Sequence, residues 1–215
     1  MNKKTTILGI IAIAFFGGII WHFGPKVNTE RQTASILDNK DNAGEEQVNL
    51  IEEEFFLGSP DAPVTMVEYS SHLCGHCSVF HDQTLPLLID KYVKTGKIKI
   101  IPRLLSPVEL GMTVLCAQEQ GKFQEMNEYL FKNVKDIKSA DDLKEKVVEA
   151  GLNKENFSTC FDSARYEENI AEWFGKAEEF NVSGTPTFFI NDQEISGNQP
   201  ISEFERVIEE ELAKN

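Results

Sequence analysis

Residues 64–77 read VTMVEYSSHLCGHC, and this stretch ends in two cysteines, Cys74 and Cys77, spaced as CxxC. Its first seven residues, Val64 to Ser70, are rich in β-branched and apolar side chains and predict a buried strand. The residues from 74 to about 92 predict a helix. Cysteines three positions apart at the start of a helix lie on one face of its first turn. We therefore expect the dithiol where a strand passes into a helix.

That position gives the two thiols different chemistry. Cys74 would face unpaired backbone N–H groups and the positive end of the helix dipole, and both favour a thiolate, the nucleophile in disulfide exchange. His76 adds a donor or a positive charge that stabilises the thiolate further. A stabilised thiolate makes the disulfide oxidising. Cys77 is expected to be less accessible and to resolve mixed disulfides, so the pattern predicts thiol–disulfide exchange.

A metal site is the competing interpretation of the motif. Zinc needs four ligands, and one CxxC supplies two. His72, His76 and His81 lie nearby and are the candidates for the remaining ligands, but the chain has no second CxxC. We therefore expect no metal and no other cofactor. An extracytoplasmic metal-handling protein, for copper, stays as an alternative of another class, although methionine-rich features are missing. A surface antigen with vestigial chemistry is disfavoured by the intact motifs.

Composition sets broad limits on the function. The chain has 215 residues, 41% of them hydrophobic, which is enough for a packed core. Its formal net charge of −14 repels phosphate backbones, so a nucleic-acid partner is disfavoured.

The N-terminal region predicts export. Lys3 and Lys4 precede an apolar run at 7–23, which is typical of an export signal. No Ala-x-Ala site follows closely, so for residues 1–27 we favour a signal anchor over a cleaved signal peptide. The lysines place the N-terminus in the cytoplasm and the rest in the periplasm or another extracytoplasmic space, attached to the inner (cytoplasmic) membrane. Residues 28–54 are acidic and predict a flexible linker.

The remaining pattern alternates strands and helices. Pro86 predicts a kink in the helix after the dithiol, and Pro102 argues that the second strand is an edge strand or that it ends near this residue. Ser139 and Asn153 are expected N-caps. Further elements are predicted as a strand at 97–104, a helical block at about 107–181, strands at 186–190 and 194–196, and an amphipathic helix at 201–213. This order is that of an α/β sheet with a helical insertion.

Three segments together resemble the DsbA-like branch of the thioredoxin superfamily. They are VEYSSHLCGHCSVFH at 67–81, LCAQEQGKF at 115–123 and VSGTPTFFI at 182–190. The resemblance covers about 55–215. It implies a thioredoxin-like sheet with an inserted helical domain.

The resemblance also implies roles for individual residues. Pro186 would follow a cis peptide bond, and Thr185 would face Cys74 and pair with a substrate strand. Without the resemblance, Pro186 merely starts a strand. Glu68 would be a buried acid that exchanges protons with the resolving thiol, and the alternative is an exposed strand glutamate.

The other two cysteines, Cys116 and Cys160, are expected to form a structural disulfide. Relatives often carry cysteines at these places, and an oxidising compartment favours pairing. The alternative is two free, buried thiols. Of the other candidates near the motif, His81 is expected on the helix surface, and Arg103 either near the site or solvated. His72 receives no role.

The function implied is a thiol–disulfide oxidoreductase that introduces disulfide bonds into exported proteins with cysteine thiols. A DsbB-like membrane partner would then reoxidise it. A disulfide reductase or isomerase is the alternative, because CGHC also occurs in protein disulfide isomerases. The absence of a recognisable dimerisation domain disfavours an isomerase like DsbC.

Overall fold

The structure is a computed structural model that describes residues 55–215. The expected signal anchor at 1–27 and the expected linker at 28–54 lie outside the described residues. Within 55–215, no helix combines the length and the apolar character needed to cross a membrane.

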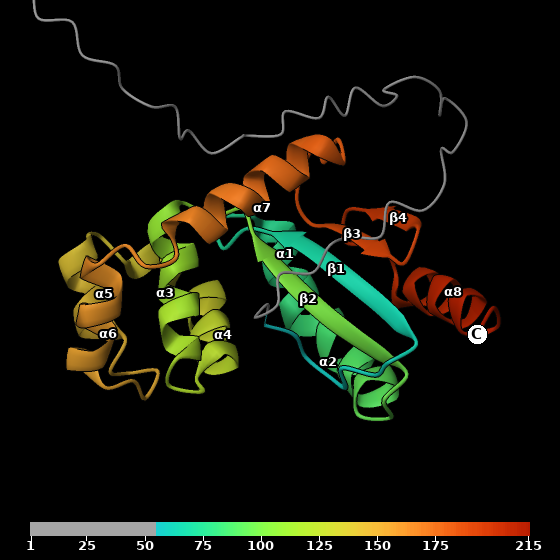
Figure 1. The fold of residues 1–215 in the computed structure, drawn as a ribbon, viewed down its shortest axis with the longest axis horizontal. Helices are drawn as coiled ribbons and strands as arrows, with labels where there is room; N and C mark the ends of the chain where they lie inside the picture. Colours follow the sequence, from blue (N-terminus) through green and yellow to red (C-terminus); the bar gives the residue numbers. More distant parts are fainter. Residues whose placement is uncertain (1–54) are drawn as a thin grey trace, which may run out of the picture. The chain divides into compact units, whose positions relative to one another are not determined.

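A four-stranded sheet forms the centre of the described chain (Figure 1). The strand order is β2-β1-β3-β4, with β1 parallel to β2 and antiparallel to β3, and with β3 and β4 forming a hairpin. The bounds are β1 Val64–Ser70, β2 Ile98–Leu104, β3 Thr187–Ile190 and β4 Gln193–Ser196. The edge position expected of the strand that carries Pro102 is confirmed.

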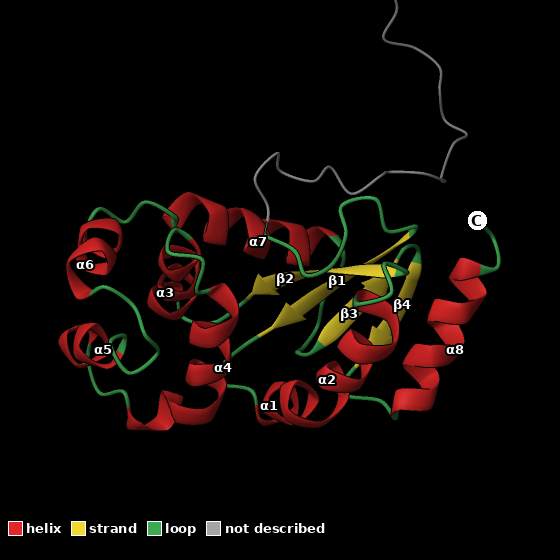
Figure 2. Ribbon diagram, turned by 90° about the horizontal axis from the view of Figure 1, so that it is seen from below, coloured by secondary structure: helices red, strands yellow, loops and turns green. Residues whose placement is uncertain are grey.

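Strand β1 is buried on both faces, which explains its nearly continuous apolar sequence. Val64 and Met66 pack on one face, against the helical segment that follows the dithiol and against helix α8 (Ile201–Leu212). Val67 and Tyr69 pack on the other, in a cluster that includes a residue of helix α7 (Glu167–Glu179). Figure 2 shows this layering, with α7 on one side of the sheet and α1 and α2 on the other.

The segment after the dithiol is helical, as expected, but it is not one regular α-helix. Helices α1 (Gly75–Val79) and α2 (Leu85–Leu88) alternate with π-helical turns at Phe80–Thr84 and Ile89–Val93. Pro86 has no N–H and cannot donate to the carbonyl four residues earlier. The wider turn lies directly before this proline, and the Leu85 N–H bonds the carbonyl of Phe80, five residues back.

The helical block lies between β2 and β3 in the sequence, as predicted. The expected N-caps are both confirmed: the side chain of Ser139 accepts from the Asp142 N–H at 3.1 Å, and that of Asn153 accepts from the Asn156 N–H at 2.9 Å. Besides α7, the helices of the block are α3 Val108–Gln118, α4 Phe123–Asn133, α5 Ala140–Lys146 and α6 Lys154–Asp162, with a 3-10 turn at Val134–Asp136.

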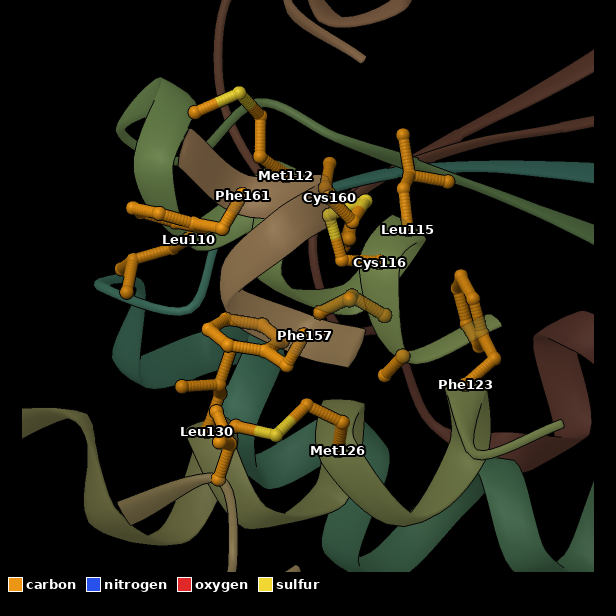
Figure 3. Close-up of a cluster of buried hydrophobic side chains, with 14 of the residues drawn as sticks. Leu110, Met112, Leu115, Cys116, Phe123, Met126, Leu130, Phe157, Cys160 and Phe161 are labelled. Atoms are coloured by element: carbon orange, nitrogen blue, oxygen red, sulfur yellow. A yellow bond between two sulfur atoms is a disulfide. The ribbon is translucent and has the colours of Figure 1, made fainter. Parts of the chain in front are cut away.

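A disulfide between Cys116 and Cys160 joins α3 to α6 inside the core of this block (Figure 3). Both cysteines are 1% exposed, and the cluster around them includes Phe157, Met126 and Leu130. The alternative of two free thiols is therefore wrong. The bond closes a loop of 44 residues, so it restricts the unfolded chain substantially.

Replacing Cys116 and Cys160 together by alanine should lower the free energy of unfolding by about 4 kcal/mol, the loop-entropy value for this separation. Urea unfolding under non-reducing conditions measures the loss. Thr159→Ala is the matched control, because it changes an exposed residue of α6 next to Cys160 and keeps the Cys116–Cys160 bond. Equal stability of the double variant and the native chain would show that the disulfide contributes nothing.

Candidate active site

Cys74 is the N-cap residue of α1. Its backbone is extended, and its sulfur accepts from the N–H of Cys77 at 3.4 Å, while its carbonyl accepts from the N–H of Ser78 at 3.1 Å. The thiol is a free thiol of intermediate exposure. The strand-to-helix junction predicted from the sequence therefore places Cys74 against the first N–H groups of the helix.

The pKa of the Cys74 thiol is lowered from its ordinary value. Partial burial acts against this shift and raises the pKa, but hydrogen bonds with the Thr185 side chain and with the backbone of Cys77 and His76 outweigh it. N–H donors bind a thiolate more strongly than a thiol, which is why they lower the pKa. His76 itself is exposed, and it contributes through its backbone N–H.

Cys77 has the opposite environment. Its side chain is fully buried, and this burial raises the pKa of the thiol to about 12. Hydrogen bonds with the Ser71 backbone and with Thr185 lower the pKa and a hydrogen bond with Cys74 raises it, but burial has the largest effect. One turn of helix thus separates a partly exposed thiol that ionises easily from a buried thiol that stays protonated.

The Thr185–Pro186 peptide bond is cis, and Thr185 meets Cys74, as the resemblance implied. The Cys74 thiol donates to the Thr185 carbonyl at 3.1 Å, across a separation of 111 residues. The loop is fixed by the Thr187 hydroxyl, which donates to the Gly184 carbonyl at 2.8 Å, and by the pairing of Thr187 with Tyr69. The sheet brings these distant segments together.

Glu68 lies at 1% exposure in β1, so the alternative of an exposed strand glutamate is wrong. Its Oε1 atom is 2.8 Å from Nε2 of His81. The expectation that His81 is a surface residue is also wrong, because its side chain is only 6% exposed. His81 follows the buried Cys77 by about one helical turn, on the side of the helix that faces the sheet. Its ring stacks on Phe131 of α4, with centroids 3.9 Å apart.

A cavity of about 370 Å³ reaches this pair of side chains. Glu68 and His81 contribute to its lining, together with apolar residues of β2 and of the segment after the dithiol and with polar residues of α4. A carboxylate and an imidazole next to such a cavity have a route for proton exchange with water.

His72, which received no role from the sequence, is buried at 2% exposure and bonded through both ring nitrogens. Nδ1 lies 3.0 Å from Oγ of Ser106, and Nε2 lies 2.8 Å from Oδ1 of Asn127. Burial lowers the pKa of His72 to about 4. The imidazole is therefore neutral at physiological pH.

Arg103 is buried at 2% exposure, so of the two alternatives the solvated side chain is wrong. Its Nη1 donates to the hydroxyl of Tyr69 at 2.8 Å, and its guanidinium carbon lies 5.6 Å from the centroid of the Tyr69 ring. Both residues pack on the face of the sheet opposite to Glu68, because Tyr69 and Glu68 are neighbours in β1.

Residues 55–215 contain no group of three or more histidine, cysteine or acidic side chains placed to hold a metal ion. Two of the three candidate histidines are engaged elsewhere, His72 with Asn127 and His81 with Glu68. The copper-handling alternative finds no support in this part of the chain.

A family model described as thioredoxin matches residues 51–210. This chain belongs to the thioredoxin family. "Disulfide bond formation protein D" of Bacillus subtilis is 24% identical over 199 residues, which cover 81% of this chain and 86% of that protein.

Two solved structures show the same fold within the thioredoxin family. The structure of Wolbachia pipientis alpha-DsbA1 has a TM-score of 0.69 at 24% identity and covers 77% of this chain and 94% of its own. Oxidised BdbD from Bacillus subtilis has a TM-score of 0.64 at 21% identity, with 74% and 93% covered. These findings confirm the DsbA-like resemblance and the thioredoxin-like sheet with its inserted helical domain.

The buried neutral His72 predicts a pH dependence of stability for this thioredoxin-family chain. The unfolded imidazole takes up a proton near pH 6.5, whereas the folded one resists until about pH 4. The contribution of His72 to the free energy of unfolding is therefore fully present above pH 6.5. It falls by about 3 kcal/mol as the pH is lowered from 6.5 to about 4. The electrostatic interaction with His81 also lowers the pKa of His72, by less than burial does.

The test compares the native chain with His72→Gln, which does not titrate and keeps an amide near Nε2. Urea unfolding at pH 7 and pH 4.5 should show a larger acid-induced loss in the native chain, since ionisations common to both proteins cancel. Identical losses in the two proteins would show that His72 is not held neutral by the fold.

Proposed function

We propose that this DsbA-like thiol–disulfide oxidoreductase introduces disulfide bonds into exported proteins, with Cys74 as the nucleophile and Cys77 as the resolving thiol. The observation that carries the proposal is the opposite environment of the two thiols. Cys74 is partly exposed with a lowered pKa, and Cys77 is buried with a pKa raised to about 12. An oxidase needs this asymmetry, because one sulfur must be reached by substrates and must also leave easily.

In the oxidised protein, the Cys74–Cys77 disulfide accepts two electrons from two substrate thiols. A substrate thiolate attacks the sulfur of Cys74, forming a mixed disulfide and releasing the sulfur of Cys77, which takes up a proton. A second substrate thiolate then attacks the substrate sulfur of the mixed disulfide. Cys74 leaves as a thiolate, and the substrate keeps the new disulfide. A lower pKa makes a thiol a better leaving group, so the lowered pKa of Cys74 favours release of oxidised product.

Glu68 is the proposed proton donor and acceptor for Cys77. A buried thiol with a pKa of about 12 is a poor leaving group unless it receives a proton as its bond breaks. Support comes from the burial of Glu68, its 2.8 Å contact with His81 and the cavity that both residues line. Water in such a cavity would return the proton to bulk solvent.

Thr185 and Pro186 form the proposed substrate-binding edge. The Thr185 carbonyl is 3.1 Å from the sulfur of Cys74, so a substrate strand that pairs with this backbone would bring its own sulfur to the nucleophile. His76, exposed beside Cys74, would meet the same substrates from the other side.

The proposed place of action is outside the cytoplasm. The basic and apolar N-terminal pattern supports export and attachment to the inner membrane, and the acidic segment 28–54 would then act as a tether. An oxidase returns to its disulfide form only if a partner removes the two electrons, and a DsbB-like membrane protein is the proposed partner. The Cys116–Cys160 bond is consistent with an oxidising compartment.

The reductase or isomerase alternative differs in reduction potential. A reduction potential of about −120 mV for the Cys74–Cys77 pair supports the oxidase, and one of about −270 mV supports the reductase. Equilibration with glutathione, read by thiol alkylation, measures it. An oxidase value is expected, because a stabilised Cys74 thiolate stabilises the reduced form.

The division of roles between the two thiols predicts different variant phenotypes. Cys74→Ala should abolish oxidation of a reduced, unfolded substrate protein. In Cys77→Ala, the Cys74 thiolate should attack the disulfide of an oxidised substrate and accumulate a mixed disulfide, because the Cys77 thiol that would displace the substrate is missing. Mass spectrometry of trapped adducts identifies the cysteine that carries the substrate. Adducts on Cys77 in the Cys74→Ala variant at equal yield would refute the assignment.

Replacement of Glu68 by glutamine should slow the reduction of the Cys74–Cys77 disulfide by about 100-fold, the lower end of general acid–base contributions. It should also flatten the pH profile of that step. Stopped-flow measurement with a dithiol peptide reports the rate. Glu211→Gln is the matched control, because Glu211 is a buried glutamate, 3% exposed, in α8. Equal slowing in both variants would mean that only stability is affected.

A further inference from the structure

We propose that His72 is a positioning residue of the dithiol: it locks the turn before Cys74 to the helical insert and thereby holds the sulfur of Cys74 in its activating contacts. The inference rests on the proposed function of Cys74 as the nucleophile. It concerns a residue that lies outside the CGHC motif and touches neither reacting sulfur.

The turn at residues 71–74 determines where Cys74 begins the helix. The N–H of Cys74 donates to the Ser71 carbonyl at 3.0 Å, and the N–H of Leu73 donates to the Ser71 hydroxyl at 3.3 Å. The N–H of His72 points elsewhere and donates to the hydroxyl of Ser106 at 2.8 Å. All three N–H groups are thus hydrogen-bonded. Those of Leu73 and Cys74 bond within the turn, and that of His72 bonds to Ser106, which lies outside it.

The imidazole of His72 adds two further anchors, and the geometry assigns its tautomer. Oδ1 of Asn127 is an acceptor, so Nε2 carries the ring proton and donates to it at 2.8 Å. Nδ1 of the neutral ring is then an acceptor, and the Ser106 hydroxyl, which also lies 3.5 Å from Oγ of Ser71, is its donor at 3.0 Å. A neutral imidazole in this tautomer satisfies both partners.

The anchors come from different parts of the fold. Ser106 follows β2, and Asn127 lies in α4. One turn further along α4, Phe131 packs on the His72 ring with centroids 4.6 Å apart, and its carbonyl accepts from the Ser78 hydroxyl at 3.5 Å. One face of α4 therefore contacts the chain both before and after the two cysteines. Figure 2 shows α4 next to α1.

This arrangement acts on Cys74 because the contacts that lower its pKa are sensitive to distance. The backbone nitrogen of Cys77 lies 3.4 Å from the sulfur, and this hydrogen bond weakens as the distance and angle depart from their values here. Release of the turn lets the sulfur move away from these donors. Leu73, the next residue in the turn, is 63% exposed, whereas His72 is buried. His72 is therefore the residue of this turn that packs into the protein. Loss of the anchors should raise the pKa of Cys74 toward its ordinary value.

The test measures the ionisation of Cys74 in the reduced protein by thiolate absorbance against pH. His72→Phe keeps a planar ring against Phe131 and removes both ring hydrogen bonds. The ionisation midpoint is expected to move upward, and the rate of reaction with a small disulfide at pH 6 should fall with the thiolate fraction. His72→Gln places an amide near Asn127, so its ionisation midpoint for Cys74 should lie between those of the native chain and His72→Phe. Ser106→Ala removes two of the three bonds without changing His72 and should shift the midpoint in the same direction, which keeps the test valid if His72→Phe folds poorly.

Thr113→Val is the matched control for a purely structural role. Thr113 is a fully buried residue of α3 whose hydroxyl donates to the Glu109 carbonyl at 2.7 Å. The Thr113→Val variant should be less stable than the native chain but should show the same ionisation midpoint for Cys74. The proposal is overturned if His72→Phe and Ser106→Ala lose stability like Thr113→Val and keep the native midpoint. Because the titration uses no substrate, a chain that proves to be a reductase would refute the proposed function and leave this measurement meaningful.

Discussion

The contact between the backbone N–H of Cys77 and the sulfur of Cys74 is the interaction on which the rest of the site depends. Cys74, the proposed nucleophile, is also the N-cap of α1, so its sulfur must sit where the first helical N–H groups point. That requirement fixes the end of β1, the turn at 71–74 and the start of α1. It also fixes the position of Thr185, because β3 pairs with β1 and brings the loop before it to the same sulfur.

Several polar side chains are buried around the dithiol; those of Glu68, His72 and Arg103 are hydrogen-bonded, whereas the hydroxyl of Ser70 has no partner among the described residues. Glu68 is bonded to His81, His72 to Ser106 and Asn127, and Arg103 to Tyr69. Burying polar groups costs stability unless they are hydrogen-bonded, and a satisfied network restricts the chain to one arrangement. The large clusters on one face of the sheet and in the insert supply the stability that such a site requires.

The features that depend on neighbours in sequence were predictable. The strand before the dithiol, the helix start at Cys74 and the N-caps at Ser139 and Asn153 follow from residues within a few positions. The meeting of Thr185 with Cys74 did not follow from spacing, and the family resemblance supplied it. The environments of His72, His81 and Arg103 were missed or wrongly predicted, because their partners lie on other elements. A signal for His81 was present, since it follows the buried Cys77 by about one helical turn.

The two thiols are the most direct test of this account. The reduced protein, labelled with ¹³Cβ-cysteine, gives separate NMR titrations for Cys74 and Cys77. The account predicts that Cys74 ionises below the ordinary value of 9.0, while Cys77 stays protonated until about pH 12. Ionisation of both thiols near pH 9.0, or of Cys77 before Cys74, would contradict it.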